Sequence, residues 1–261
     1  PCPLVTSTHS AFMVKSVDDY AALDAMAEAT TYRADRQALA GELRRLGDDG
    51  VMVIGGGPGS PLYRLVESLV GIERFSYHLM DHPDVVQRTM TALHEQACRW
   101  YRAAAAAPGD AVRCTEDLDT KLVSPGWFTR FAVGCLADYA RICHEAGKLF
   151  VIHMCGHINA FLEQVRDLPA DAIHCVSPPP AGNTTPGRAM QALEGRCAAM
   201  LRFDASTLLG GTPEQIDRAV DELVGQVDGR PGAMVIMPCG RAPLANIRRV
   251  ISRVHHFTGH G

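Results

Sequence analysis

Residues 122–156 read LVSPGWFTRFAVGCLADYARICHEAGKLFVIHMCG, and this stretch holds one complete helix-then-strand unit. Ser124 and Pro125 are typical of a helix start, and Gly147 is typical of a helix end. Apolar side chains recur between them at helical spacing. The apolar run at 148–156 predicts a buried strand. The segment therefore predicts a helix that packs beside a strand of a parallel sheet.

The same alternation continues along the chain. Short apolar runs predict strands at 51–54, 111–117, 148–156, 172–177, 198–204 and 233–239, with a further short run near Leu4–Thr6. Helical patterns separate these runs, which indicates βαβ units and an α/β fold with a parallel sheet. The pattern leaves two architectures open, because six strands fill a doubly wound sheet whereas a (β/α)8 barrel needs eight. No low-complexity linker divides the chain, so we predict a single domain over residues 1–261.

Composition narrows the class of protein. Of the 261 residues, 47% are hydrophobic and 21% charged, which excludes a disordered chain. With a net charge of −4, the chain has no excess of basic residues that would indicate nucleic-acid binding. No apolar run reaches the roughly 18–20 residues that span a membrane. Nine scattered cysteines suit a disulfide framework poorly and favour the cytoplasm. The chain opens at Pro1, as expected for a processed start or a piece of a longer product.

The residues that carry chemistry stand at predicted strand ends, where parallel α/β folds place their sites. His153 and Cys155 are two apart on one strand, so their side chains point the same way. Cys239 ends the last predicted strand. One imidazole and two thiolates are ligands that zinc prefers, and three protein ligands leave one position open, as in catalytic zinc sites. The pattern predicts a zinc site, and a chance placement of these residues is the alternative.

A His-x-Cys pair with a third Cys about eighty residues later resembles the zinc signature of the uroporphyrinogen decarboxylase-like superfamily. It resembles in particular the zinc-containing, corrinoid-dependent branch, which includes methylcobalamin:coenzyme M methyltransferases and, more distantly, cobalamin-independent methionine synthase. The segments at 55–86, 122–156 and 211–220 resemble the same superfamily, and together these features cover most of residues 50–256. The resemblance implies a (β/α)8 TIM barrel, here with a shortened N-terminal part.

The resemblance implies a zinc-dependent methyltransferase. Such an enzyme moves a methyl group between a corrinoid (cobalamin) and a zinc-activated thiol or related acceptor. No Asp-x-His-x-x-Gly corrinoid-binding motif is recognisable, so the corrinoid is expected on a partner protein or as free cobalamin, beside a small-molecule methyl donor or thiol acceptor. A uroporphyrinogen decarboxylase-like lyase or folate-linked demethylase component stays open, although the arginine-rich N-terminal segment of the decarboxylase is not evident. A non-catalytic zinc- or corrinoid-binding subunit is the other alternative.

Three further residues are candidates for this site. His174 stands about where relatives carry a glutamate, which makes it a candidate metal ligand or substrate contact, with a packed histidine as the alternative. Glu116, near the end of the strand predicted at 111–117, is the other candidate for the fourth zinc position. Asp204 ends the strand predicted at 198–204 and is a candidate to orient a ligand or accept a proton, with a helix cap as the alternative.

Other features carry less weight. Asp117 and Asp119 share the loop after the 111–117 strand and are expected to be solvated, whereas Cys114 and Cys175 are weaker candidates near the mouth of the barrel. The glycine-rich stretch 55–60 lacks the Lys-Ser/Thr of a P-loop, which favours a tight turn over a phosphate site.

Overall fold

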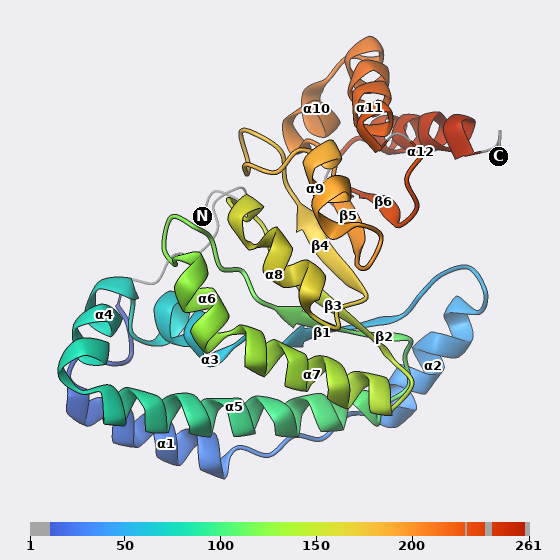
Figure 1. Cartoon of the computed structure of the whole chain (residues 1–261). Helices are drawn as coiled ribbons and strands as arrows, with labels where there is room; N and C mark the ends of the chain where they lie inside the picture. Colours follow the sequence, from blue (N-terminus) through green and yellow to red (C-terminus); the bar gives the residue numbers. More distant parts are fainter. Residues whose placement is uncertain (1–10, 228, 238–241, 259–261) are drawn as a thin grey trace. The chain divides into compact units, whose positions relative to one another are not determined.

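The structure is a computed structural model, and it describes residues 11–227, 229–237 and 242–258. It divides into two compact units, Pro1–Glu116 with Gly126–Lys148, and Asp117–Pro125 with Leu149–Gly261. Parallel strands alternate with helices in both units (Figure 1). No helix within the described ranges is long and apolar enough to cross a membrane.

The first unit is mainly helical. In chain order it contains η1 (Val17–Asp19), α1 (Tyr20–Ala29), α2 (Arg36–Leu46), β1 (Val53–Gly57), α3 (Pro61–Tyr63), the π-helical η2 (Arg64–Leu69), α4 (Ile72–Asp81), α5 (Pro83–Ala105), β2 (Ala111–Thr115), most of α6 (Pro125–Phe131) and α7 (Val133–Glu145). Strand β1 pairs in parallel with β2, with Val53 opposite Ala111. Helix α5 packs against α1 and α7.

The apolar stripe of α5 explains why this helix forms the centre of the first unit. Val86, Met90, Leu93, Ala97 and Tyr101 recur every three or four residues, and all five are buried. Pro83 stands in its first turn, where a missing N–H costs no helical hydrogen bond. The Tyr101 ring stacks on a tyrosine ring of α7, with the ring centroids 4.4 Å apart. The helical spacing of these apolar residues therefore accounts for the buried face of α5.

The second unit carries four strands among its described residues. It contains β3 (Leu149–His153), η3 (Asn159–Phe161), α8 (Leu162–Asp167), β4 (Ala172–Val176), α9 (Pro186–Leu193), β5 (Ala198–Arg202), α10 (Ala205–Gly210), α11 (Pro213–Val227), β6 (Ala233–Ile236) and α12 (Leu244–Thr258). Strands β3 to β6 pair in parallel, each with the next in the chain. The register sets His153 beside His174 at the ends of β3 and β4. This pairing brings two predicted site residues together.

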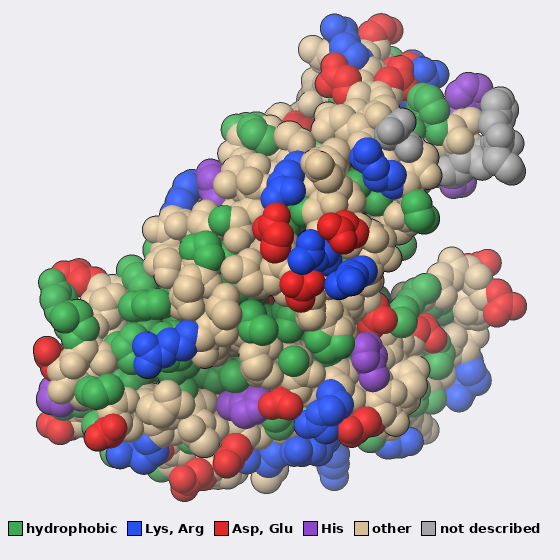
Figure 2. Space-filling model, viewed as in Figure 1, with side chains coloured by type: hydrophobic (Ala, Val, Ile, Leu, Met, Phe, Trp, Pro, Cys, Tyr) green, Lys and Arg blue, Asp and Glu red, His purple; other side chains and the backbone are tan. Residues whose placement is uncertain are grey.

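Ion pairs tie the last two helices of the second unit to one another. Arg249 and Arg253 of α12 each hold an aspartate of α11, Asp217 and Asp221, through two hydrogen bonds of 2.6–2.8 Å. Acidic and basic side chains are interspersed over the face in Figure 2. Partly exposed pairs of this kind contribute about 0–1 kcal/mol each, so they add modestly to the contact between α11 and α12.

The predicted α/β fold with a parallel sheet is confirmed. Each of the six strands predicted beyond residue 50 is present, and the described residues thereby supply six of the eight strands of a complete barrel. The strand predicted near Leu4–Thr6 lies outside the described residues. Most strands end earlier than the apolar runs do, whereas β1 continues through Gly57, beyond the predicted end at Ile54. Helix α10 was not predicted, and the helix predicted after Ser124 is interrupted at Ala132. The single domain stays a prediction.

Candidate metal centre

The His-x-Cys-Gly motif forms a tight turn at the end of β3. His153 is the last residue of the strand, and Cys155 lies just beyond it. The Cys155 backbone N–H donates to Asp117 Oδ1 at 2.9 Å. Gly156 has φ +82, and a Cβ there would lie 2.4 Å from Asp119 Oδ2. The glycine of the motif is therefore required by both the backbone conformation and the close carboxylate.

Asp119 holds the other side of this turn. Its Oδ2 accepts the His157 backbone N–H at 2.8 Å and lies 3.2 Å from His157 Nδ1, while its Oδ1 accepts the Lys121 N–H at 2.6 Å. Burial raises the pKa of the Asp119 carboxyl, but these hydrogen bonds outweigh it and lower the pKa overall. Asp119 is thus a structural anchor of the turn, whereas Asp117, two residues earlier, lies with His153 and Cys155.

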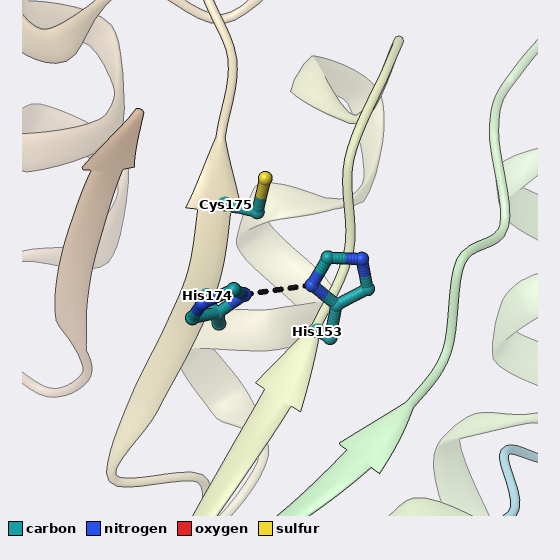
Figure 3. A group of neighbouring side chains, drawn as sticks. All are labelled: His153, His174 and Cys175. Atoms are coloured by element: carbon teal, nitrogen blue, oxygen red, sulfur yellow. Dashed lines mark hydrogen bonds between the residues drawn. The ribbon is translucent and has the colours of Figure 1, made fainter. Parts of the chain in front are cut away.

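A bulge in β4 brings a second pair of donors to the site. Against β5, His174 pairs with Met200 and Val176 with Leu201, so Cys175 is an extra residue in its strand. Its φ is +78, a conformation that side-chain-bearing residues rarely adopt. Neighbouring residues of a regular strand point to opposite faces. The bulge instead lets His174 and Cys175 both contribute to one cluster, drawn in Figure 3.

Two donor groups share His153. The ligand atoms of His153, His174 and Cys175 lie within 4.8 Å of one another, and so do those of Asp117, His153 and Cys155. His153 Nε2 is 3.9 Å from Asp117 Oδ1. Imidazole, thiolate and carboxylate are the ligand types of zinc sites. The chemistry of the described donors therefore fits a zinc ion at the ends of β3 and β4.

The two imidazoles are joined by a hydrogen bond. His153 Nδ1 and His174 Nδ1 are 2.7 Å apart (Figure 3). Two nitrogens bound to one tetrahedral zinc at about 2.0–2.1 Å lie about 3.3 Å from each other. The observed contact is too short for both Nδ1 atoms to ligate one zinc without a shift. In this arrangement His174 orients the His153 ring, as hydrogen-bond partners of metal-binding histidines commonly do.

The two thiols of the cluster influence each other. The Cys155 S–H donates to the Cys175 sulfur, which lowers the pKa of Cys175 and raises that of Cys155. Burial opposes the change at Cys175, and the positive charge of Arg202 at the end of β5 supports it. A thiolate is the form of cysteine that binds metals.

Glu116 lies in the first unit, and its surroundings are those of a structural carboxylate. It is fully buried, and its two oxygens accept the Ser60 N–H and the Ser60 O–H, the latter at 2.6 Å. A Cβ on Gly59 would lie 2.2 Å from the Thr115 carbonyl oxygen and 2.7 Å from Glu116 Oε2. The glycine-rich turn after β1 is therefore packed against the end of β2 and anchored by Glu116.

Asp204 caps helix α10. It is the N-cap residue, and its carboxylate accepts the Thr207 N–H at 2.6 Å and the Ser206 hydroxyl. Although burial raises the pKa of the Asp204 carboxyl, these hydrogen bonds lower it overall. The structure thus gives Asp204 a clear role at the helix start, whereas Cys239 lies outside the described residues.

Substitution of Asp204 separates its capping role from a chemical one. We expect Asp204→Ala to lower the free energy of unfolding by about 1 kcal/mol, because a helix N–H loses its acceptor. Asp204→Asn should keep nearly all of the stability, since asparagine caps as well as aspartate does. Urea unfolding of the three proteins measures the difference. Equal losses in both variants would contradict a capping role.

Two members of the cluster, Asp117 and Cys175, are only weakly indicated by the sequence. Asp117 directly follows Glu116 in the chain, and its contact with the Cys155 backbone depends on the loop conformation. Cys175 reaches the cluster only through the bulge in β4. The signal available in the sequence was the adjacent His174-Cys175 pair at a predicted strand end.

Comparison with known proteins adds independent information. The family model described as Uroporphyrinogen decarboxylase (URO-D) matches residues 7–257. No curated protein sequence matches the chain. Among solved structures, a methyltransferase from Methanosarcina mazei is similar with a TM-score of 0.70 and 18% identity, over 88% of this chain and 69% of that one.

Two other solved structures are much less similar. A putative orotidine 5'-phosphate decarboxylase from Streptomyces avermitilis has a TM-score of 0.38 and 15% identity, over 81% of this chain and 72% of that one. A macrophomate synthase has a TM-score of 0.35 and 12% identity, over 96% and 77% of the two chains. The family model matches nearly all of the sequence, and the chain therefore belongs to the uroporphyrinogen decarboxylase (URO-D) family.

Proposed function

We propose that this protein is a zinc-dependent methyltransferase that moves a methyl group between a corrinoid and a thiol or related acceptor. The observation that carries the proposal is the cluster of imidazole and thiol donors at the ends of β3 and β4. Its occurrence in a URO-D family chain, and the likeness of the fold to a methyltransferase from Methanosarcina mazei, support it. We propose the cytoplasm as its compartment, because none of the seven described cysteines forms a disulfide.

The proposed zinc ligands are His153, Cys155 and Cys239, with His174 as a further candidate. When bound, zinc supplies a Lewis acid that keeps a thiol acceptor deprotonated at neutral pH. The hydrogen bond between His174 and His153 supports a fixed orientation of the His153 ring. The contact of Asp117 with the Cys155 backbone holds the turn that carries this thiol. These contacts prepare the donors before an acceptor arrives.

The proposed methyl transfer requires no further oxidant or reductant. The acceptor sulfur forms a bond to the methyl carbon while the carbon–cobalt bond of the corrinoid breaks, and the electron pair of that bond stays on cobalt. The corrinoid is proposed to arrive on a partner protein or as free cobalamin. The proposal keeps Glu116 as a candidate for the fourth zinc position and Asp204 as a candidate to orient a ligand or accept a proton, beside their structural hydrogen bonds.

A selenol analogue of the acceptor tests the proposal directly. If the acceptor is activated by zinc, its selenium should enter the metal shell, where X-ray absorption distinguishes selenium from protein sulfur. We therefore expect a zinc–selenium contact in the zinc-loaded protein, together with methyl transfer from methylcobalamin to the corresponding thiol. The metal-free protein should show neither.

Other outcomes of this experiment favour the alternatives. Turnover by a metal-free protein would favour a decarboxylase-like lyase or a folate-linked demethylase component. Zinc binding without turnover for any thiol would favour a non-catalytic binding subunit.

A further inference from the structure

Arg113, in the middle of β2, carries a guanidinium whose Nε is buried and has no hydrogen-bond partner in the described part of the chain. A buried donor without a partner is costly, and more so when the group is charged. The acidic residues nearest to it in the chain bind elsewhere: Asp110 accepts the Met52 N–H at 2.7 Å. Glu116 accepts both donors of Ser60. The positive charge of Arg113 therefore needs a partner other than these two carboxylates.

A bulge of two glycines in β1 lies opposite this arginine. Between the regular pairs at Ile54 and Gly57, β1 has two residues, Gly55 and Gly56, where β2 has only Arg113. Both glycines are exposed, and Gly56 has φ +79. Glycine in a strand often marks a place where a ligand or another backbone approaches closely. The bulge also interrupts the ladder, which frees backbone groups of β1 for another partner.

The guanidinium turns its bidentate edge toward Gly55. A Cβ at Gly55 would lie 3.2 Å from Arg113 Nη2 and 4.0 Å from Arg113 Nε. These two nitrogens donate side by side, in a geometry that matches two oxygens of a carboxylate or a similar oxoanion. Any other residue at position 55 would place its side chain in front of this edge. Glycine at this position therefore leaves the edge open to a ligand.

We propose that Arg113 and the Gly55–Gly56 bulge form a binding site for a singly charged oxoanion, namely the carboxylate or sulfonate group of a small molecule. One guanidinium balances one negative charge and supplies two charge-assisted hydrogen bonds. A doubly charged phosphate matches a single guanidinium less well. The residues of this site all lie within the first unit, and the site does not depend on the proposed zinc centre.

Nuclear magnetic resonance of the isotope-labelled full chain tests the site with acetate and methanesulfonate as probes. The arginine Nε–H signal that disappears in Arg113→Gln identifies Arg113. We expect both probes to shift this signal to saturation, whereas chloride at equal ionic strength should leave it unchanged. The Gly55 amide signal should shift in parallel in the wild type and stay in place in Arg113→Gln. Arg102→Gln, which removes an exposed arginine of α5, is the matched control and should respond as the wild type does.

Gly55→Ala tests the same site with the guanidinium retained. Its Cβ would stand 3.2 Å from Arg113 Nη2, at the edge where the oxoanion is proposed to bind. We expect acetate binding to weaken at least about 10-fold, since one or both hydrogen bonds to the guanidinium are lost. Gly41→Ala, in α2 with open space where its Cβ would stand, is the matched control and should bind acetate with unchanged affinity.

Three results would overturn this inference. The first is an Arg113 signal that neither acetate nor methanesulfonate moves. The second is a signal that phosphate alone moves, or that chloride moves equally well. The third is equal acetate affinity in Gly55→Ala and Gly41→Ala. None of these results bears on zinc, so the proposed function would stand in each case.

Discussion

Cys155→Ser should leave the protein folded but unable to retain zinc. The serine hydroxyl fits the same turn and keeps the backbone N–H that Asp117 accepts at 2.9 Å. It is a far poorer zinc ligand than a thiolate. Loss of a supporting residue near a metal costs about 10–100-fold in affinity or activity, so loss of a direct ligand should cost more than 100-fold in both. Elemental analysis after dialysis, and methyl transfer from methylcobalamin to a thiol, measure the two effects.

The control for this experiment is Cys197→Ser. Cys197 is buried in the same unit, and burial raises the pKa of its thiol to about 12. It belongs to neither donor group. This variant should bind zinc and transfer methyl groups as the wild type does. If both serine variants retained a full equivalent of zinc, Cys155 would not be a ligand and the proposed centre would be wrong.

The order of strands and helices was predictable because each depends on local patterns. The periodic apolar residues of α5 and the β-branched run in β3 stand out in the sequence, and both elements are present. The ends of strands were less predictable. Hydrophobicity continues through Met154 and Cys155, but pairing with β4 ends at His153 because the chain turns there. Conversely, β1 includes Gly55–Gly57, since pairing with β2 outweighs the low strand propensity of glycine.

The candidate site was only partly predictable, because part of it depends on the pairing of strands and not on local sequence patterns. His153 and Cys155 are recognisable from their spacing, and parallel register then sets His174 beside them. In a regular strand the side chain of Cys175 would point to the opposite face from that of His174. Cys175 joins the cluster only because of a bulge in β4, and the sequence pattern does not predict this bulge. Glu116 and Asp204 were chosen for their places at strand ends, where carboxylates also anchor turns and cap helices. Position alone does not separate these roles.

The largest effect on folding is expected from Gly156→Ala. The substitution places a Cβ on a residue with φ +82, and that atom would lie 2.4 Å from Asp119 Oδ2. The left-handed conformation alone costs a residue with a side chain about 1–2 kcal/mol. Displacement of Asp119 also weakens its bonds to the His157 and Lys121 amides. We expect the free energy of unfolding to fall by about 2–3 kcal/mol in urea titrations.

Gly225→Ala is the matched control for this change. Gly225 lies in α11 of the same unit, is exposed, and has open space where a Cβ would stand. Alanine at a helical site of this kind should raise the stability by up to about 1 kcal/mol. The two alanine substitutions should therefore move the unfolding free energy in opposite directions. Since the 153–156 turn carries the Cys155 ligand, Gly156→Ala should also weaken zinc binding, whereas Gly225→Ala should not. A Gly156→Ala protein of wild-type stability and zinc affinity would mean that the turn does not depend on glycine.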